Sequence, residues 1–193
     1  MAKPNVREQL LEAGLRVLST QGFNGTSVQD ITDAASVPKG SFYNHFESKE
    51  ALGAEVVRRY LDQASARQAA LRDPAVAPIV RLRRHFEELA QGVEGREFCG
   101  GCLLGNFAAE MSEQSEMIRT GVCDAFASWA TKMTETVAEA QAAGEISTAI
   151  APDALAAFLL NSWEGAQIRA RAEKSRVPMQ QFLDITFGKV LAP

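Results

Sequence analysis

Two cysteines three positions apart, Cys99 and Cys102, are the residues whose type and spacing most directly suggest chemistry. They lie in the segment FCGGCLLGN, immediately before an apolar run with helical spacing. Such a pair can bind a metal, exchange a disulfide, react with an electrophile or fill a core. A structural zinc site needs four ligands, and only Cys123, His85 and His45 remain, with no second pair at a recognisable spacing. The sequence therefore predicts no metal and no cofactor.

A redox enzyme would carry such a pair after a strand of a βαβ unit, and strand alternation is almost absent from this sequence. A thiol in the first turn of a helix lies beside unpaired backbone amides, which favour the reactive thiolate. Cys102 follows two glycines at the start of a helix expected over about 101–111, so we expect its thiol to be reactive. The alternative is a buried filler, and this alternative is favoured for Cys99 and Cys123.

Apolar residues recur at three- and four-residue intervals along nearly the whole chain, which predicts an all-α fold of about nine helices. With 193 residues and 46% hydrophobic content, the chain can bury one core or two smaller ones. The helices are expected over residues 5–21, about 27–35, 38–46, from 48 onward, around 79–89, about 101–111, about 115–143, 152–172 and 178–190.

Local capping signals mark the ends of the first four helices. Gly22 stands where a C-terminal cap is needed, and Ser27 and Asp30 have the spacing of a capping box. Pro38 suits the first turn of the second short helix, and Ser48 suits the N-terminal cap of the long helix that follows.

Composition favours a cytoplasmic protein. Three cysteines are too few for a disulfide scaffold, and their odd number indicates a reducing compartment. No apolar stretch approaches the roughly 18 residues that span a bilayer, and the start of the sequence lacks a signal-peptide core. We therefore expect neither secretion nor a membrane.

Two short helices joined by a four-residue break predict a helix-turn-helix module that binds double-stranded operator DNA. The formal charge of residues 1–60 is zero, so the placement of each basic group must decide the contact. The second short helix can enter the major groove by its N-terminal end, and the remaining polar groups can donate to phosphates. The expected DNA contacts are Thr26, Ser27, Lys39, Gly40, Ser41, Tyr43, His45 and Lys49.

A packing role is the alternative for Tyr43 and His45, since a lone aromatic ring and a lone histidine usually face neighbouring helices. Phe42 and Phe46 are better packing candidates because they are fully apolar, which leaves the polar pair facing outward.

The segment TSVQDITDAASVPKGSFYNHFESKEAL, residues 26–52, resembles the DNA-binding signature of the TetR family of bacterial transcriptional repressors. The matching positions are Ile31, Ala34, Ala35, Val37, Gly40, Tyr43, His45, Phe46, Lys49 and Leu52. The resemblance implies a homodimer, with DNA binding in residues 1–50, effector binding and dimerisation in residues 51–193, and a dimer formed through the last two helices. Ser36 stands where many members have Gly and Pro38 where many have Ser, which leaves the operator sequence open.

Two later segments, GCLLGNFAAEMSEQSEMIR and WEGAQIRARAEKS, are similar to the N-ethylmaleimide-responsive and acrylate-responsive repressors of this family. This similarity implies a small electrophile or an unsaturated acid as effector, with the reactive thiol at Cys102. Arg171 stands where electrophile-sensing relatives have a lysine, and Lys174 is a possible substitute. Arginine stays protonated, so sensing is either noncovalent, with an acid held by Arg171, or covalent at Cys102 with Cys99 as a resolving thiol.

Aromatic residues of the second half can line an effector pocket, although such stripes are more often core. The pocket candidates are Phe107, Trp129 and Trp163. A helical enzyme or a thiol oxidoreductase is the competing class of function. The sequence holds no nucleophile elbow, phosphate loop or nucleotide fingerprint, so we expect a regulator and not an enzyme.

Overall fold

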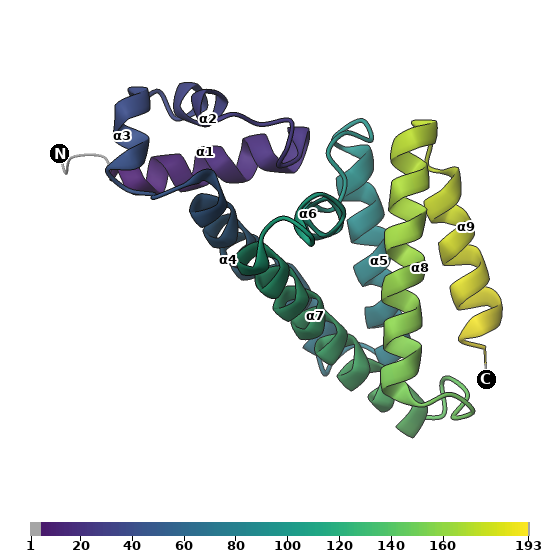
Figure 1. Ribbon diagram of the computed structural model, residues 1–193. Helices are drawn as coiled ribbons and strands as arrows, with labels where there is room; N and C mark the ends of the chain where they lie inside the picture. The colour runs from purple at the N-terminus through teal and green to yellow at the C-terminus, as the bar shows by residue number, and fades with distance from the viewer. Residues whose placement is uncertain (1–4, 193) are drawn as a thin grey trace. The chain divides into compact units, whose positions relative to one another are not determined.

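The protein, described by a computed structural model over residues 5–192, consists of helices and connecting loops without a strand in that range (Figure 1). The predicted all-α class and the number of helices are confirmed. The helices are α1 Val6–Gln21, α2 Val28–Ala34, α3 Lys39–Tyr43, α4 Lys49–Gln68, α5 Pro78–Glu94, α6 Leu103–Met111, α7 Glu116–Ala142, α8 Pro152–Glu173 and α9 Val177–Ile185. A 3₁₀ turn, η1 Ala69–Arg72, follows α4, and a π-helical turn, η2 Thr186–Val190, follows α9.

The chain folds into two compact units. The first unit contains the described residues up to Gln63 together with Cys102–Ala125, and the second contains Ala64–Gly101 and the described residues from Phe126 onward. This division by packing interleaves the chain and differs from the functional boundary expected at residue 50, which stays a prediction. None of the described helices combines the length and the apolar character that crossing a membrane requires.

Helices α1, α2 and α3 pack against one another in the first unit, and the predicted caps hold their ends. The amide of Gly22, which has a φ of 80°, donates to the Leu18 carbonyl and closes α1. Ser27 and Asp30 form the complete capping box of α2, with the Ser27 hydroxyl accepting from the Asp30 amide at 3.1 Å. The local signals therefore place these helix ends correctly.

The second short helix, α3, is shorter than predicted, because it ends at Tyr43 and not at Phe46. The amide of Phe46 still donates to the Phe42 carbonyl at 2.9 Å, which is the last bond of helical spacing, and the two rings pack with centroids 5.7 Å apart. Ser48 then caps α4, where its hydroxyl accepts from the Ala51 amide at 3.1 Å. Burial of Phe46 in the core and an early cap for the next helix thus stop α3 after five residues.

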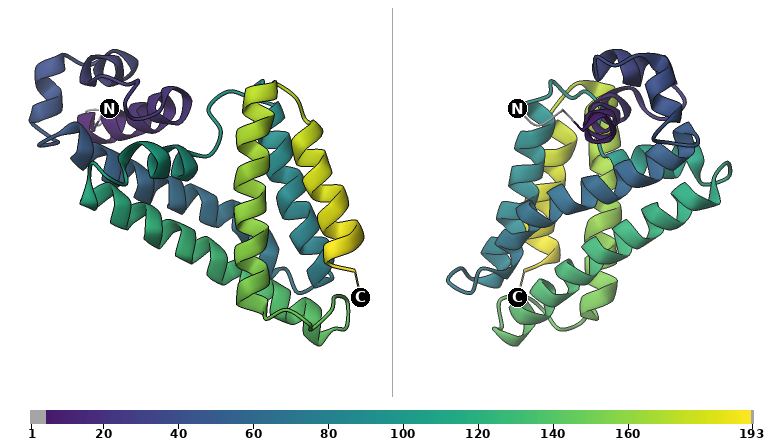
Figure 2. Two further views of the ribbon diagram at one scale, coloured as in Figure 1. Left: turned by 45° about the vertical axis from the view of Figure 1, so that its right-hand side comes forward. Right: turned by 90° about the vertical axis from the view of Figure 1, so that its left-hand side faces the viewer.

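An aromatic cluster fills the second unit, where α5, α8 and α9 lie side by side (Figures 1 and 2). Phe86 of α5 meets Trp163 of α8 and Phe182 of α9 at centroid distances of 5.4 and 4.9 Å, and the last two rings are 5.4 Å apart. All three side chains are buried. Each pair of such rings contributes about 0.5–1.5 kcal/mol beyond its area burial, so this cluster ties the three helices together.

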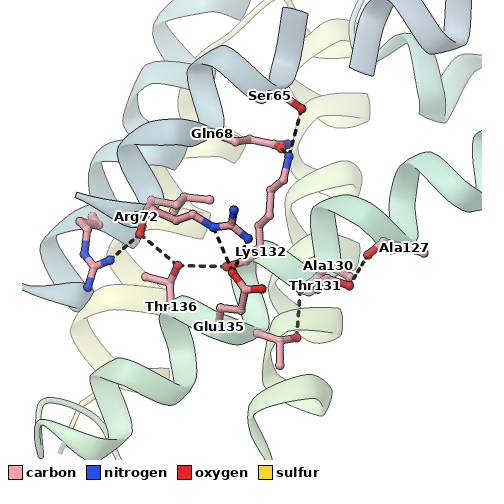
Figure 3. Close-up of polar contacts among 12 residues, drawn as sticks. Ser65, Gln68, Arg72, Ala127, Ala130, Thr131, Lys132, Glu135 and Thr136 are labelled. Carbon is pink, nitrogen blue, oxygen red and sulfur yellow. Dashed lines mark hydrogen bonds and ion pairs between the residues drawn. The ribbon is translucent and has the colours of Figure 1, made fainter. Parts of the chain in front are cut away.

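Polar contacts join the end of α4 and η1 to α7 in the second unit (Figure 3). The Lys132 ammonium donates to the Ser65 hydroxyl at 3.1 Å and to the Gln68 side-chain oxygen at 2.8 Å. The Arg72 guanidinium pairs with Glu135 at 2.6 Å. These contacts fix where α4 ends against α7.

The buried Arg81 of α5 reinforces the same junction. Its guanidinium donates to the Leu71 carbonyl at 2.6 Å and forms an ion pair with Glu139 of α7. The Thr136 hydroxyl also donates to the Leu71 carbonyl, at 3.3 Å. Because a buried charge is costly without its partner, we regard Arg81 as a structural residue.

One backbone position is strained, and it gives a test of the turn between α2 and α3. Ser36 is exposed and has a φ of 55°, in the left-handed region that costs a residue with a Cβ about 1–2 kcal/mol. We expect Ser36→Gly to raise the free energy of unfolding by about 0.5–1 kcal/mol, after the larger entropy of the unfolded glycine chain is subtracted. Thermal and urea denaturation measure this change.

The matched control is Ser128→Gly, at an exposed position inside α7. That substitution should lower the free energy of unfolding by about 0.5–1 kcal/mol, because glycine weakens a helix interior. Equal destabilisation by the two glycines would contradict the strain at Ser36.

Candidate nucleic-acid interface

The reading head, which we define as α2, α3, the turn between them and the two residues after α3 (residues 28–45), has polar side chains on its outer face and apolar side chains beneath them. Tyr43 is 59% exposed, and Lys39, Gly40 and His45 are also exposed. Phe42 is fully buried and packs edge-on against the Tyr43 ring, with centroids 5.3 Å apart. The outward orientation predicted for Tyr43 and His45 is confirmed, and their packing alternative is wrong.

The N-terminal end of α3 is open to an approaching ligand. A Cβ built on Gly40 would meet nothing within 4 Å, and Ser41 beside it is half-buried. Pro38 provides the N-cap residue with extended backbone, and its carbonyl accepts from the Ser41 amide at 2.8 Å. A phosphate or base edge can therefore reach the backbone here, with the Lys39 ammonium beside it.

Thr26 and Ser27 differ from the phosphate donors that the sequence predicts. Thr26 is 2% exposed, and its hydroxyl donates to the Gly22 carbonyl at 2.7 Å, so the structure gives it a loop-closing role. The exposed Ser27 hydroxyl bonds to Asp30, donating to a carboxylate oxygen at 2.7 Å. The burial and internal bond of the Thr26 hydroxyl disfavour a direct contact with DNA in this conformation, and that contact stays a prediction.

Lys49 is also engaged inside the protein. Its ammonium donates to the carbonyls of Phe23 at 2.9 Å and Thr26 at 2.7 Å, and it lies 4.3 Å from the centroid of the Phe23 ring. An ammonium has three donors, so at most one remains for a phosphate. The main role of Lys49 in the structure is to hold the loop between α1 and α2, which sequence reasoning missed.

The capping box also changes the pKa of its acidic residue, Asp30. The Ser27 hydroxyl and then the Ser27 amide hold the pKa of the Asp30 carboxyl below its ordinary value of 3.8, and the charge of Lys49 acts in the same direction. On α1, a hydrogen bond from Arg59 lowers the pKa of Glu8, and the same contact raises the pKa of Arg59.

The sensor candidate Cys102 is buried, with 6% exposure, at the residue just before α6. The helix starts two residues later than predicted, at Leu103, so Cys102 is the N-cap residue and its thiol makes no capping hydrogen bond. Its sulfur lies 4.0 Å from the hydroxyl oxygen of Tyr60 on α4. The structure therefore adds Tyr60 to the sensor candidates, and no local pattern in the sequence could have paired residues 42 positions apart.

Cys99 is exposed and lies beside a lysine. The Lys174 ammonium donates to the Phe98 carbonyl at 3.2 Å and approaches the Cys99 sulfur at 3.9 Å. Arg171 is one turn earlier on α8, where its Cδ would be 3.8 Å from a Cβ on Gly101. Lys174, the substitute considered for Arg171, thus lies next to the thiol of Cys99.

The aromatic pocket candidates occupy different places. Phe107 is on α6 and packs edge-on against Phe23 at 5.5 Å in the first unit. Trp129 and Trp163 belong to the core of the second unit, and the Trp129 indole donates to His85 Nε2 at 3.1 Å. The Trp163 indole nitrogen is buried with no hydrogen-bond partner among the described residues. Within residues 5–192, no cluster of three His, Cys, Asp or Glu side chains could hold a metal.

Comparison with known proteins gives two family matches. The family described as "Bacterial regulatory proteins, tetR family" matches residues 10–56, and "Tetracyclin repressor-like, C-terminal domain" matches residues 78–186. The transcriptional repressor DhaR of Mycobacterium sp. strain GP1 is 42% identical over 192 residues, which cover 99% of this chain and 95% of DhaR.

Two solved structures extend the comparison. A TetR regulatory protein from Rhodobacter sphaeroides has a TM-score of 0.88 at 34% identity, covering 94% of this chain and 96% of that chain. Reduced NemR from E. coli has a TM-score of 0.81 at 25% identity, covering 93% of each chain. Since the identity with NemR is well below that with DhaR, the narrower resemblance to electrophile-sensing repressors has only weak support.

The capping box predicts a specific response to acid. Because the folded pKa of Asp30 is below 3.8, its carboxylate stabilises the fold above that pH, and the contribution is lost as the pH falls through the folded pKa. We expect Asp30→Asn to lower the melting temperature at pH 7, with a difference from the wild-type protein that shrinks below pH 3.8. Thermal melts across this range measure the difference.

Ser27→Ala serves as the partner variant, because it removes the hydroxyl that lowers the pKa of Asp30 most. In that background the pH-dependent part of the Asp30→Asn effect should become smaller, while the Ser27 amide and Lys49 still lower the pKa of Asp30. A difference that stays constant from pH 7 to pH 3 would contradict this account of the α2 cap.

Proposed function

Because the chain belongs to the TetR family of bacterial transcriptional regulators, we propose that it is a repressor that binds a near-palindromic operator as a homodimer and leaves it when a small effector binds. The observation that carries the proposal is the outward face of the reading head, where Lys39 and Tyr43 are exposed above the buried Phe42. The relatives are regulators, so the enzymatic alternative has no support.

The DNA contact follows from this face. The N-terminal end of α3 enters the major groove, with Lys39 and Ser41 toward the base edges and Tyr43 and His45 toward the flanking phosphates. One helix of five residues gives little affinity, so two copies must bind together. A two-fold dimer places them in successive major grooves about 34 Å apart. Such a protein acts in the cytoplasm, where bacterial DNA lies.

The dimer forms through α8 and α9. Two large apolar side chains there are exposed in the single chain, Phe158 at 47% and Ile185 at 58%. They border a shallow groove of about 270 Å³, which Phe182 and Val190 also line. Apolar surface of this kind is what a second copy of the same face can cover, and the resemblance to the family implies the same interface.

For the effector, the covalent alternative centres on Cys102. Its buried position beside the Tyr60 hydroxyl means that any group attached to the sulfur must displace side chains around the start of α6. An electrophilic alkene reacts by addition. The Cys102 thiolate sulfur forms a bond to one alkene carbon while the C=C π bond breaks, and the adjacent carbon takes a proton from water, which replaces the proton that the thiol released. The noncovalent alternative, an acid held by Arg171, is supported by the chemistry of the guanidinium alone.

The DNA proposal is tested by removing one contact of each kind. Tyr43→Phe should weaken binding to all sequences by about 5–10-fold, because it removes one hydrogen bond to a phosphate and leaves the ring in place. Lys39→Ala should reduce the slope of log affinity against log salt by about 1 and relax sequence preference. Fluorescence anisotropy with an operator selected from random DNA by the purified protein measures both.

Arg84→Ala is the control, since it removes an exposed cation of α5 outside the reading head. It should change neither affinity nor salt slope. If Tyr43→Phe and Lys39→Ala also left both unchanged, α3 would not be the DNA-binding element.

The sensor proposal is tested with N-ethylmaleimide as the probe. Modification of the wild-type protein should lower operator affinity by roughly tenfold or more, because overpacking a buried site costs about 1–3 kcal/mol. Cys102→Ser should bind the operator normally and ignore the reagent, whereas Cys99→Ser and Cys123→Ser, at exposed positions, should still respond. If N-ethylmaleimide lowered the operator affinity of Cys102→Ser as much as that of the wild-type protein, Cys102 would be only a packing residue and the noncovalent alternative would remain.

A further inference from the structure

The loop between α1 and α2, residues 22–27, is tied to α6 by a carboxylate. Glu110, in the last turn of α6, accepts the amide of Asn24 on Oε2 at 2.6 Å. Its other oxygen lies against Gly22, where an added Cβ would collide with it. The carboxylate therefore touches the loop backbone at two places, and the two partners are 86 residues apart in the sequence.

The same loop is held from α4 by a charge of the opposite sign. The Lys49 ammonium donates to the carbonyls of Phe23 and Thr26, and the Phe23 ring contacts both that ammonium and the Phe107 ring of α6. Two carbonyls of the loop thus accept hydrogen bonds from the Lys49 ammonium, and the Asn24 amide donates one to the Glu110 carboxylate. Because hydrogen bonds to charged groups are stronger than those between neutral groups, the position of the loop depends on both helices.

This loop sets where the reading head begins. It ends at Ser27, which caps α2, and α2 packs directly against α3. The bond from the Thr26 hydroxyl to the Gly22 carbonyl joins the two ends of the loop. A displacement of α6 must therefore either break the contact between Glu110 and Asn24 or carry the start of α2 with it.

We infer that Glu110 is a positioning residue for DNA binding, through which α6 and the reading head control each other. The inference rests on the proposed binding of DNA by α3 and does not depend on which effector acts or on Cys102. A contact that only stabilised the loop would affect melting and affinity alone. A coupling contact must also work in reverse, because linkage between two sites is reciprocal. DNA binding at the reading head should therefore change the stability of α6, which its amide hydrogen exchange reports.

Amide hydrogen exchange of the full-length protein, with and without its selected operator, tests this reciprocity. In the wild-type protein, DNA should slow exchange in residues 22–27 and also in α6. In Glu110→Ala, DNA should slow exchange in the reading head but no longer in α6, and operator affinity should fall by about 5–10-fold. Glu110→Gln keeps an oxygen that can accept from Asn24, so most of the α6 response should return.

Glu113→Ala is the matched control, because it removes an exposed carboxylate just after α6. It should leave the exchange of α6 and the affinity as in the wild-type protein. An α6 response to DNA that is the same in Glu110→Ala as in the wild-type protein would overturn the inference, while the proposed function would stand. Absence of DNA binding by the wild-type protein would overturn both.

Discussion

Two backbone groups of the loop between α1 and α2, the Asn24 amide and the Thr26 carbonyl, are bonded to side chains from distant positions of the first unit, and the reading head depends on these contacts. The loop has six residues and cannot form a regular ladder of its own, so side chains must supply part of its hydrogen bonding. Lys49 supplies donors and Glu110 supplies an acceptor, from positions 23 to 86 residues away. Without both, the cap of α2 would have no fixed place from which α3 could face DNA.

Different interactions stabilise the two units. In the first, polar groups lie over a small apolar core, so the orientation of its short helices depends on a few directional contacts such as the capping box of α2. The second is held by ring packing around Phe86 and by the buried Arg81, which are costly to disturb. Switching proteins commonly combine a densely packed unit with contacts that can rearrange, since a conformational change needs both.

Features set by neighbouring residues were predictable from sequence. The helix ends at Gly22, Ser27 and Ser48 follow from capping chemistry, and the outward placement of Tyr43 follows from the two phenylalanines beside it. The end of α3 was misplaced because Phe46 is drawn into a core that the sequence pattern does not specify.

Features set by distant residues were not predictable in this way. Thr26 and Lys49 were expected at the DNA because family resemblance and polarity favour it, but their partners are carbonyls of their own loop. The sequence did not predict three contacts, because each joins segments more than 40 residues apart. They are those of Glu110 with Asn24, of Tyr60 with Cys102 and of Lys174 with Cys99. Such pairs depend on how helices pack, and helical periodicity carries no information about that.

The central claim is that the exposed faces of two copies of α3 bind one DNA duplex. Hydroxyl-radical footprinting of the selected operator measures this arrangement most directly. Two protected windows on one face of the DNA, with centres about 10 base pairs or about 34 Å apart, are the predicted result. A single protected window, or two whose separation does not match the helical repeat, would contradict it.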